Sequence, residues 1–208
     1  MCWNETVSLN TFLFSFFGSS LAYFNNVIYI YSYLYLISFI SIQLLEYFTW
    51  KYLNNKKINK LLSQLGLFLI AIQPILFILA IPNIENTVKT SVIALYILFC
   101  FGCILYFTID FSMTKAPNGH LAWHWLNFPP YIVLIWVLFI FILLLYSKSY
   151  FRFIFYTLLF IAIYYTYYKT NTWGSLWCWI ANITTIYLIT NVFFHSSIPS
   201  YLLINNKV

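Results

Sequence analysis

Long stretches without a charged residue are the feature that most constrains this chain. No Asp, Glu, Lys or Arg occurs from Thr6 to Leu45, and such a run is long enough for two passes of about 20 residues each through a bilayer. Of the 208 residues, 63% are hydrophobic and 7% are charged, whereas about 25% of the residues in a soluble domain are charged. The sequence therefore predicts an integral membrane protein and excludes an ordinary soluble globule.

The same composition excludes three other classes of protein. A chain with so few charges and so many apolar residues does not have the composition of a disordered protein. Its ten Lys and Arg residues are scattered between apolar runs, so they form no basic stripe for a nucleic acid. Four Cys in a chain of this kind do not indicate a disulfide framework. We expect the lipid bilayer to be the main partner and expect no nucleic acid partner.

Turn signals and charged residues divide the chain into seven predicted helices within a single domain, residues 1–208. Asn25 and Asn26 offer a turn inside the first uncharged run, and four lysines at positions 51–60 form the next connector. Further spans are predicted at 61–81, 88–109, 131–146, 151–168 and 177–194. Residues 112–130 contain several Pro and Gly turn signals and should lie outside the membrane. The predicted fold is an all-α membrane protein with seven transmembrane helices and short loops, whose first helix is retained.

An odd number of spans would bring the unusual side chains to one membrane face. The N-terminus then shares its face with three connectors that hold six of the ten Lys and Arg residues, which favours a cytoplasmic N-terminus. Three of the four carboxylates, Glu5, Glu46 and Asp110, belong to the same face, as do His120 and His124. The sequence predicts that any chemistry is concentrated there.

Gln43, Glu46 and Trp50 are spaced i, i+3 and i+7, which places them on one stripe of a helix. A carboxylate in or near hydrocarbon is costly and usually faces the bundle interior or a water cavity. Glu46 is therefore a candidate for carrying a proton or binding a substrate, with Gln43 as its neighbour. The alternative is an interfacial glutamate that headgroup water solvates, close to Lys51. The sequence leaves both interpretations open.

A second polar stripe follows the last predicted helix. Ser175, Cys178, Asn182 and Thr185 are spaced i, i+3, i+7 and i+10. Small polar residues commonly mediate packing between membrane helices, and this is the favoured interpretation. A stripe that enters the membrane from the same face as Glu46 could instead line a cavity.

Gln73 precedes Pro74 in the middle of the third predicted helix. Proline removes a helix hydrogen bond and frees a carbonyl group. In a membrane the freed group must be satisfied by neighbours or must line a cavity. The sequence does not decide between a kink with a functional use and plain packing.

His120 and His124 are four residues apart, a spacing that would place both on one helix face, and Asp110 lies upstream. Metal sites use such a spacing together with a carboxylate, but a third clear ligand is missing, so no metal or cofactor is predicted. The alternative is an amphipathic surface segment that Trp123 and Trp125 anchor among the headgroups. The Trp-rich run at 173–179 is likewise interpreted as part of an aromatic belt.

Five motifs occur in order along the chain: Met1-Cys2-Trp3, Gln43-Leu44-Leu45-Glu46 with Trp50, Gln73-Pro74, Gly119-His120-Leu121-Ala122-Trp123 and Gly174-Ser175-Leu176-Trp177-Cys178-Trp179. With these motifs the chain resembles an uncharacterised family of small seven-helix membrane proteins from giant DNA viruses and some algae and protists. The resemblance brings no activity, but it implies that the motifs at one face form a single site. It also implies residence in a host internal membrane or a virion membrane. The family pattern includes His120 but not His124.

Three functions of different classes fit these features, and the sequence leaves open whether the protein is an enzyme. We rank binding or transport of a small solute, ion or lipid first, through a polar site near the N-terminal face. A structural or adaptor protein of a viral or host membrane, with the Trp-rich face as its docking surface, comes second. An interfacial lipid-modifying enzyme comes last: Glu46 or Asp110 would act with His120 as acid and base, and Cys2 or Cys178 as nucleophile. The candidate residues are Gln43, Glu46, Trp50, Gln73, Asp110, His120, Trp123, Ser175, Trp177, Cys178 and Asn182.

Overall fold

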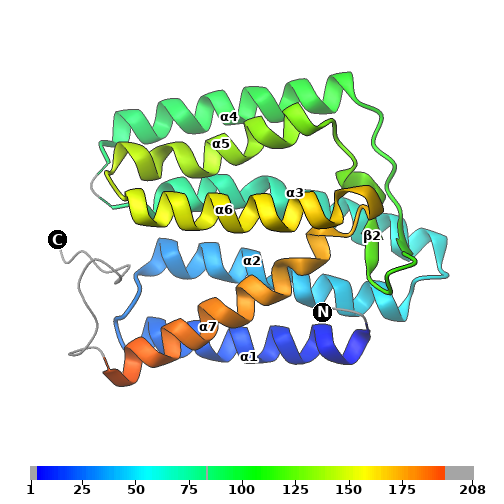
Figure 1. Cartoon of the computed structure of the whole chain (residues 1–208), viewed down its shortest axis with the longest axis horizontal. Helices are drawn as coiled ribbons and strands as arrows, with labels where there is room; N and C mark the ends of the chain where they lie inside the picture. Colours follow the sequence, from blue (N-terminus) through cyan, green and yellow to red (C-terminus); the bar gives the residue numbers. More distant parts are fainter. Residues whose placement is uncertain (1–3, 83, 195–208) are drawn as a thin grey trace.

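The computed structural model describes residues 4–82 and 84–194, apart from the side chains of residues 175–177. Within these ranges the chain forms seven α-helices that run roughly side by side (Figure 1). The helices are α1 (Glu5–Phe24), α2 (Ile30–Lys51), α3 (Lys56–Ala80), α4 (Asn86–Tyr106), α5 (Pro130–Tyr146), α6 (Tyr150–Tyr167) and α7 (Trp177–Phe194). The predicted all-helical fold with seven helices is confirmed.

The helix ends follow the turn signals of the sequence. The Asn4 side chain accepts a hydrogen bond from the backbone N–H of Val7 (2.8 Å), and Asn55 accepts one from Ile58 (3.2 Å). These asparagines satisfy backbone donors that the first turns of α1 and α3 leave open. Asn26 takes a left-handed φ of 57° between α1 and α2, a conformation that Asn tolerates well. The predicted turn at this position is confirmed.

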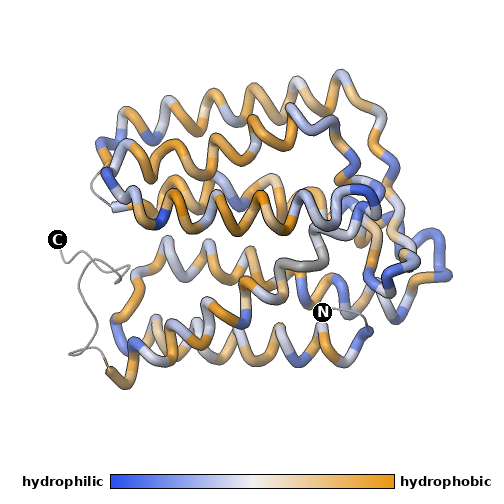
Figure 2. Tube along the Cα trace, in the orientation of Figure 1, coloured by the Kyte–Doolittle hydropathy of each residue, from blue (hydrophilic) through white to orange (hydrophobic). Residues whose placement is uncertain are grey.

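Four helical stretches are long and apolar enough to cross a membrane by length and composition: α1, α3, α4 and Tyr150–Thr170, which continues α6. Helices α5 and α7 are apolar but shorter. Helix α2 has 22 residues, but its Ser and Tyr residues together with Gln43 and Glu46 lower its hydropathy. Figure 2 shows hydrophobic residues along all the helices, with hydrophilic residues concentrated at the two ends of the bundle.

Helix α2 lies in the middle of the first half of the bundle, packed against α1 and α3 and in contact with α7. Helix α1 turns a row of small residues inward: Ser8, Thr11, Ser15, Gly18, Ser19 and Ala22. A Cβ atom on Gly18 would lie 2.4 Å from Cγ2 of Thr185, so α7 approaches α1 closely at this glycine. Small residues allow such close contact between membrane helices, which supports the packing interpretation of the α7 stripe at Thr185.

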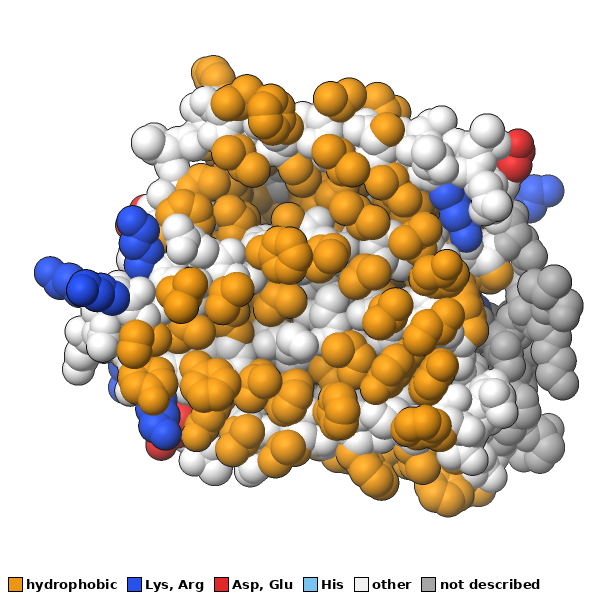
Figure 3. All heavy atoms as spheres, turned by 180° about the vertical axis from the view of Figure 1, so that it is seen from behind, with side chains coloured by type: hydrophobic (Ala, Val, Ile, Leu, Met, Phe, Trp, Pro, Cys, Tyr) orange, Lys and Arg blue, Asp and Glu red, His pale blue; other side chains and the backbone are white. Residues whose placement is uncertain are grey.

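The outer helices leave a large apolar surface. Helix α4 buries a single residue, Tyr96, and α6 buries none. Figure 3 shows apolar side chains over most of one face, with Lys and Arg side chains near its two ends. Leu105 on α4, for example, is 71% exposed. An apolar face of this extent requires apolar surroundings.

The segment between α4 and α5 lies outside the helices, as predicted, but it forms a β-hairpin. Strand β1 (Met113–Lys115) pairs antiparallel with β2 (Leu121–Trp123), and the 3₁₀ turn η1 (His124–Leu126) follows. Gly119, with φ of 82°, adopts in the connecting turn a conformation that glycine readily takes. The prediction that His120 and His124 share a helix face is therefore wrong, because residues 121–123 between them form a strand.

Candidate functional site

Two of the polar motifs, the one with Gln43, Glu46 and Trp50 and the one with His120 and Trp123, lie at the end of the bundle that carries the hairpin, called here the hairpin end. Helix α2 ends there and α3 and α7 begin there, beside β2 (Figure 1). Because the seven helices alternate in direction, the starts of the odd-numbered helices and the ends of the even-numbered ones share this end. The expectation that Glu46 and His120 belong to the same end of the molecule is confirmed.

Glu46, Gln43 and Thr49 on α2 are all 0% exposed. Their burial follows from the central position of α2, which has α1, α3 and α7 around it. Headgroup water therefore does not solvate Glu46, and the interfacial alternative is wrong. Trp50, one helical turn after Glu46, is partly buried. Burial of a carboxylate costs several kcal/mol, so Glu46 marks this end of α2 as the strongest candidate site.

Helix register places further polar residues at the depth of Glu46. Because α1 and α2 are antiparallel and joined by a short turn, Ser8 lies at the level of Glu46, and Thr11 at the level of Gln43. From α7, the Asn182 amide donates a hydrogen bond to the Thr11 hydroxyl (3.4 Å). We call Ser8, Thr11, Gln43, Glu46 and Asn182 the polar layer. It joins three helices by side chains that can donate and accept hydrogen bonds.

The hairpin covers the end of α2 beyond Glu46. Its first residue, Met113, is 1% exposed, and its sulfur lies 3.8 Å from the hydroxyl oxygen of Thr49, which donates its proton to the Leu45 carbonyl (2.9 Å). Thr49 follows Glu46 by three residues, about one turn of α2. From α3, Asn59 binds both backbone groups of Met113. Asn59 was missed by sequence reasoning, because it belongs to no motif and to no polar stripe.

Trp123 and Trp125 lie inside the protein. Their rings stack at 5.0 Å with an interplanar angle of 15°, and they are 0% and 1% exposed. A Cβ atom on Gly174 would lie 2.3 Å from Trp123, and one on Gly66 would lie 2.7 Å from Trp125. The expectation that these indoles anchor among lipid headgroups is wrong, because two glycines provide the space for them inside the bundle.

Three indole N–H groups near this end are buried. Among the described side chains and backbone, Nε1 of Trp50, Trp123 and Trp125 has no hydrogen-bond acceptor. The indole N–H can only donate, and buried polar groups without a partner are rare in folded proteins. The hairpin end therefore combines a buried carboxylate with buried donors.

The two histidines of the hairpin have different surroundings. The ring of His120 meets Tyr167 edge-on at 6.3 Å, and burial lowers the pKa of its imidazole below the ordinary value. The ring of His124 shares a hydrogen bond with the Thr114 hydroxyl on the paired strand (2.8 Å). No group of three or more His, Cys, Asp or Glu residues able to hold a metal lies in the described part of the chain.

Other candidates lie apart from the polar layer or outside the described side chains. Asp110 is exposed on the segment that follows α4. Gln73 is buried (3% exposed) but lies 14 residues beyond Asn59 on α3, about 21 Å along the axis. Cys178 is buried at the start of α7. The side chains of Ser175 and Trp177, and all of Cys2 and His195, lie outside the described residues.

Helix α3 continues through Gln73 and Pro74, and a side chain of α4 contacts this part of it. The Tyr96 hydroxyl on α4 donates a hydrogen bond to the carbonyl of Ala71 (2.8 Å). Ala71 lies next to Ile70, the residue whose carbonyl Pro74 leaves without its helical donor. This arrangement favours packing over a functional use of the kink.

Comparisons with protein-family models, with curated proteins and with solved structures find no match to this chain. The resemblance to the seven-helix family thus stays a prediction.

Proposed function

We propose that the chain is a multi-pass integral membrane protein whose seven helices all cross the bilayer. The apolar outer surfaces of α4 and α6 support this proposal, because exposed apolar faces of this extent are typical of helices that face lipid. Helix α2 is less apolar than a typical span, but α1, α3 and α7 surround it, so little of it needs to face lipid. The positive-inside rule favours the hairpin end on the cytoplasmic side.

Within this frame we infer that the polar layer binds a small solute or ion, and that the protein transports it or responds to it. The observation that carries this inference is the carboxylate of Glu46, which is 0% exposed inside the bundle. Ionisable residues within transmembrane segments are rare because they are costly, and they commonly mark substrate, ion or proton pathways.

The chemistry of the polar layer suits a cation or a solute rich in donors. An ionised carboxylate only accepts hydrogen bonds, whereas the Gln43 amide both accepts and donates. The Thr11 hydroxyl adds a group with both capacities, and the Ser8 hydroxyl, which donates to the Asn4 carbonyl (3.3 Å), adds an acceptor. Because Met113 contacts α2 at Thr49, passage of a solute toward the hairpin end requires the hairpin or its neighbours to move. A solute that only binds to the polar layer from within the bundle requires no such movement.

Liposome flux measurements test this proposal. Purified protein in vesicles with a potassium gradient is assayed for proton flux with a pH-sensitive dye and for potassium flux with a potassium-sensitive dye. Glu46→Gln and Gln43→Ala are expected to abolish the flux. Glu85→Gln and Gln64→Ala are the matched controls, because both residues are exposed, and they should keep it. Elution profile and thermal unfolding must show that all four variants fold. Wild-type flux in both polar-layer variants would overturn the proposal.

The two alternatives gain less from the geometry. An adaptor that docks a partner through its Trp-rich face would need exposed indoles. Trp179 is 44% exposed, but Trp123, Trp125 and Trp173 are buried. An interfacial enzyme that uses Glu46 would need this carboxylate at the lipid boundary, and it lies inside the bundle. The buried position of Glu46 therefore favours the solute-binding function.

A further inference from the structure

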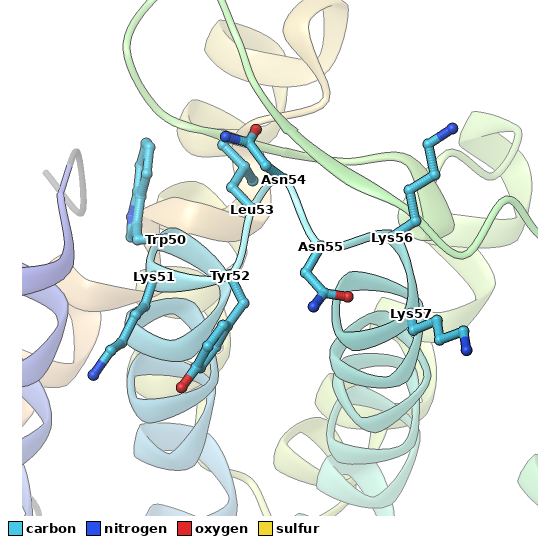
Figure 4. A pocket seen from close by; sticks show the side chains of 8 residues that line it. All are labelled: Trp50, Lys51, Tyr52, Leu53, Asn54, Asn55, Lys56 and Lys57. Carbon is cyan, nitrogen blue, oxygen red and sulfur yellow. The ribbon is translucent and has the colours of Figure 1, made fainter.

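A basic cleft lies where α2 turns into α3. It has a volume of about 660 Å³ and is lined by Trp50, Lys51, Tyr52, Leu53, Asn54, Asn55, Lys56 and Lys57. In Figure 4, Lys51 and Tyr52 extend from the end of α2, and Lys56 and Lys57 extend from the start of α3, with Lys51 and Lys57 pointing to opposite outer sides of the helix pair. All three lysines are exposed, and the lining contains no Asp or Glu. The charge of this cleft is complementary to an anion.

The cleft adjoins the apolar outer surface of α3. Lys57, Leu61, Leu65 and Phe68 are spaced i, i+4, i+8 and i+11, which places them on one face of the helix. Leu61, Leu65 and Phe68 are 55%, 46% and 61% exposed. The Lys57 backbone therefore lies about one turn, or roughly 6 Å along the axis, from side chains suited to lipid tails.

The end of α2 repeats this arrangement. Phe48 is 38% exposed and precedes Lys51 and Tyr52 by three and four residues, so all three belong to one side of the helix. The Lys51 ammonium lies over the Tyr52 ring, 6.0 Å from its centroid. Tyrosines and lysines beside an apolar surface are typical of the headgroup region of a membrane.

The acidic groups at the hairpin end lie outside the cleft, so they do not neutralise the charge of its lysines. Glu46 is buried, while Glu5 and Asp110, both exposed, lie at the start of α1 and after α4. A cluster of lysines next to a span attracts anionic lipid. We propose that the cleft between α2 and α3 binds the phosphate-bearing headgroup of an anionic lipid in the leaflet at the hairpin end. This inference rests on the membrane-spanning proposal but is independent of the solute site.

Lipid retention tests the inference. Full-length protein is reconstituted in vesicles of phosphatidylcholine and phosphatidylglycerol, extracted with a mild detergent and analysed for bound lipid. The triple variant Lys51→Gln/Lys56→Gln/Lys57→Gln is compared with Lys115→Gln/Lys148→Gln/Lys169→Gln. The second triple also removes three exposed lysines, two of them at the hairpin end, but leaves the cleft intact. Resistance of each protein to alkaline extraction is measured first, so that failure of the membrane proposal is recognised separately.

We expect wild-type protein and the control triple to retain phosphatidylglycerol in excess over its share in the vesicles. The cleft triple should lose about half or more of that excess, because each lysine near an anionic surface contributes about 1 kcal/mol, or about fivefold in affinity. An unchanged excess in the cleft triple would overturn the inference, and so would an equal loss in both triples. Loss of the wild-type excess on addition of inorganic phosphate at constant ionic strength would also overturn it, in favour of a soluble phosphate ligand.

Discussion

The side chain of Asn59 binds the backbone of Met113 at both its donor and its acceptor. The Met113 N–H donates to Oδ1 of Asn59 (2.9 Å), and Nδ2 of Asn59 donates to the Met113 carbonyl (2.8 Å). The side-chain amide of a residue on α3 thus makes the pair of backbone hydrogen bonds that a neighbouring strand would make with β1. This pair attaches the hairpin to α3, while Met113 contacts Thr49 on α2. The contact of the hairpin with Thr49, one turn beyond Glu46, therefore depends on a residue outside every motif.

Asn59→Ala should destabilise the protein by about 1–3 kcal/mol, because two buried backbone groups of Met113 lose their partner. Thermal unfolding in detergent measures the loss. Asn54→Ala removes an exposed amide from the turn before α3 and should leave the unfolding temperature nearly unchanged. Equal unfolding temperatures for the two variants would show that the Asn59 pair contributes nothing to stability.

Gly66→Ala and Gly174→Ala should each cost about 1–3 kcal/mol, because the added methyl group overlaps Trp125 or Trp123. Near-ultraviolet circular dichroism should also lose signal from the stacked indoles. Gly102→Ala is the control, because a Cβ atom there meets nothing within 4 Å. It should be neutral or stabilise α4 by up to about 1 kcal/mol. A control as damaging as the other two would contradict the packing argument.

Chemical labelling should distinguish the carboxylates by their exposure. A water-soluble carbodiimide with an amine is expected to modify exposed Glu85 and to spare Glu46, which is 0% exposed. Peptide mass spectrometry measures the modified fraction at each site. Unfolding in denaturant should remove the difference, which controls for the intrinsic reactivity of the two peptides. Equal modification of both residues in the folded protein would show that water reaches the polar layer.

Stability should fall as the pH is lowered through the range in which histidine titrates. Burial lowers the pKa of His120 in the folded state, whereas the unfolded chain has an ordinary value of about 6.5. Below that value the unfolded state binds more protons, so protonation favours unfolding. The unfolding temperature should drop between about pH 7.5 and pH 5.5. His120→Gln should reduce this drop and His124→Gln should preserve it; the reverse result would contradict the assignment to His120.

The helices and their turns could be predicted because their signals are local. Charge-free runs gave helix positions within a few residues of α3 to α7, and the Asn25-Asn26 turn was placed correctly. The i, i+3 spacing of Gln43 and Glu46 likewise requires only the geometry of one helix. The β-hairpin was missed because its strands have three residues each, too few for a periodic pattern to be recognised.

The spacing of residues along the chain was sufficient for the seven helices and for the shared end of their polar motifs, since hydropathy and turn preference depend on neighbours in sequence. The spacing alone could not predict that Glu46 is buried inside the bundle or that Trp123 and Trp125 belong to the core. It also could not predict that Asn59 binds the backbone of the hairpin. These properties depend on contacts between residues far apart in the chain, such as Asn59 with Met113 and Gly174 with Trp123. Only packing of the helices and the hairpin brings these residues together, and burial arises from that packing.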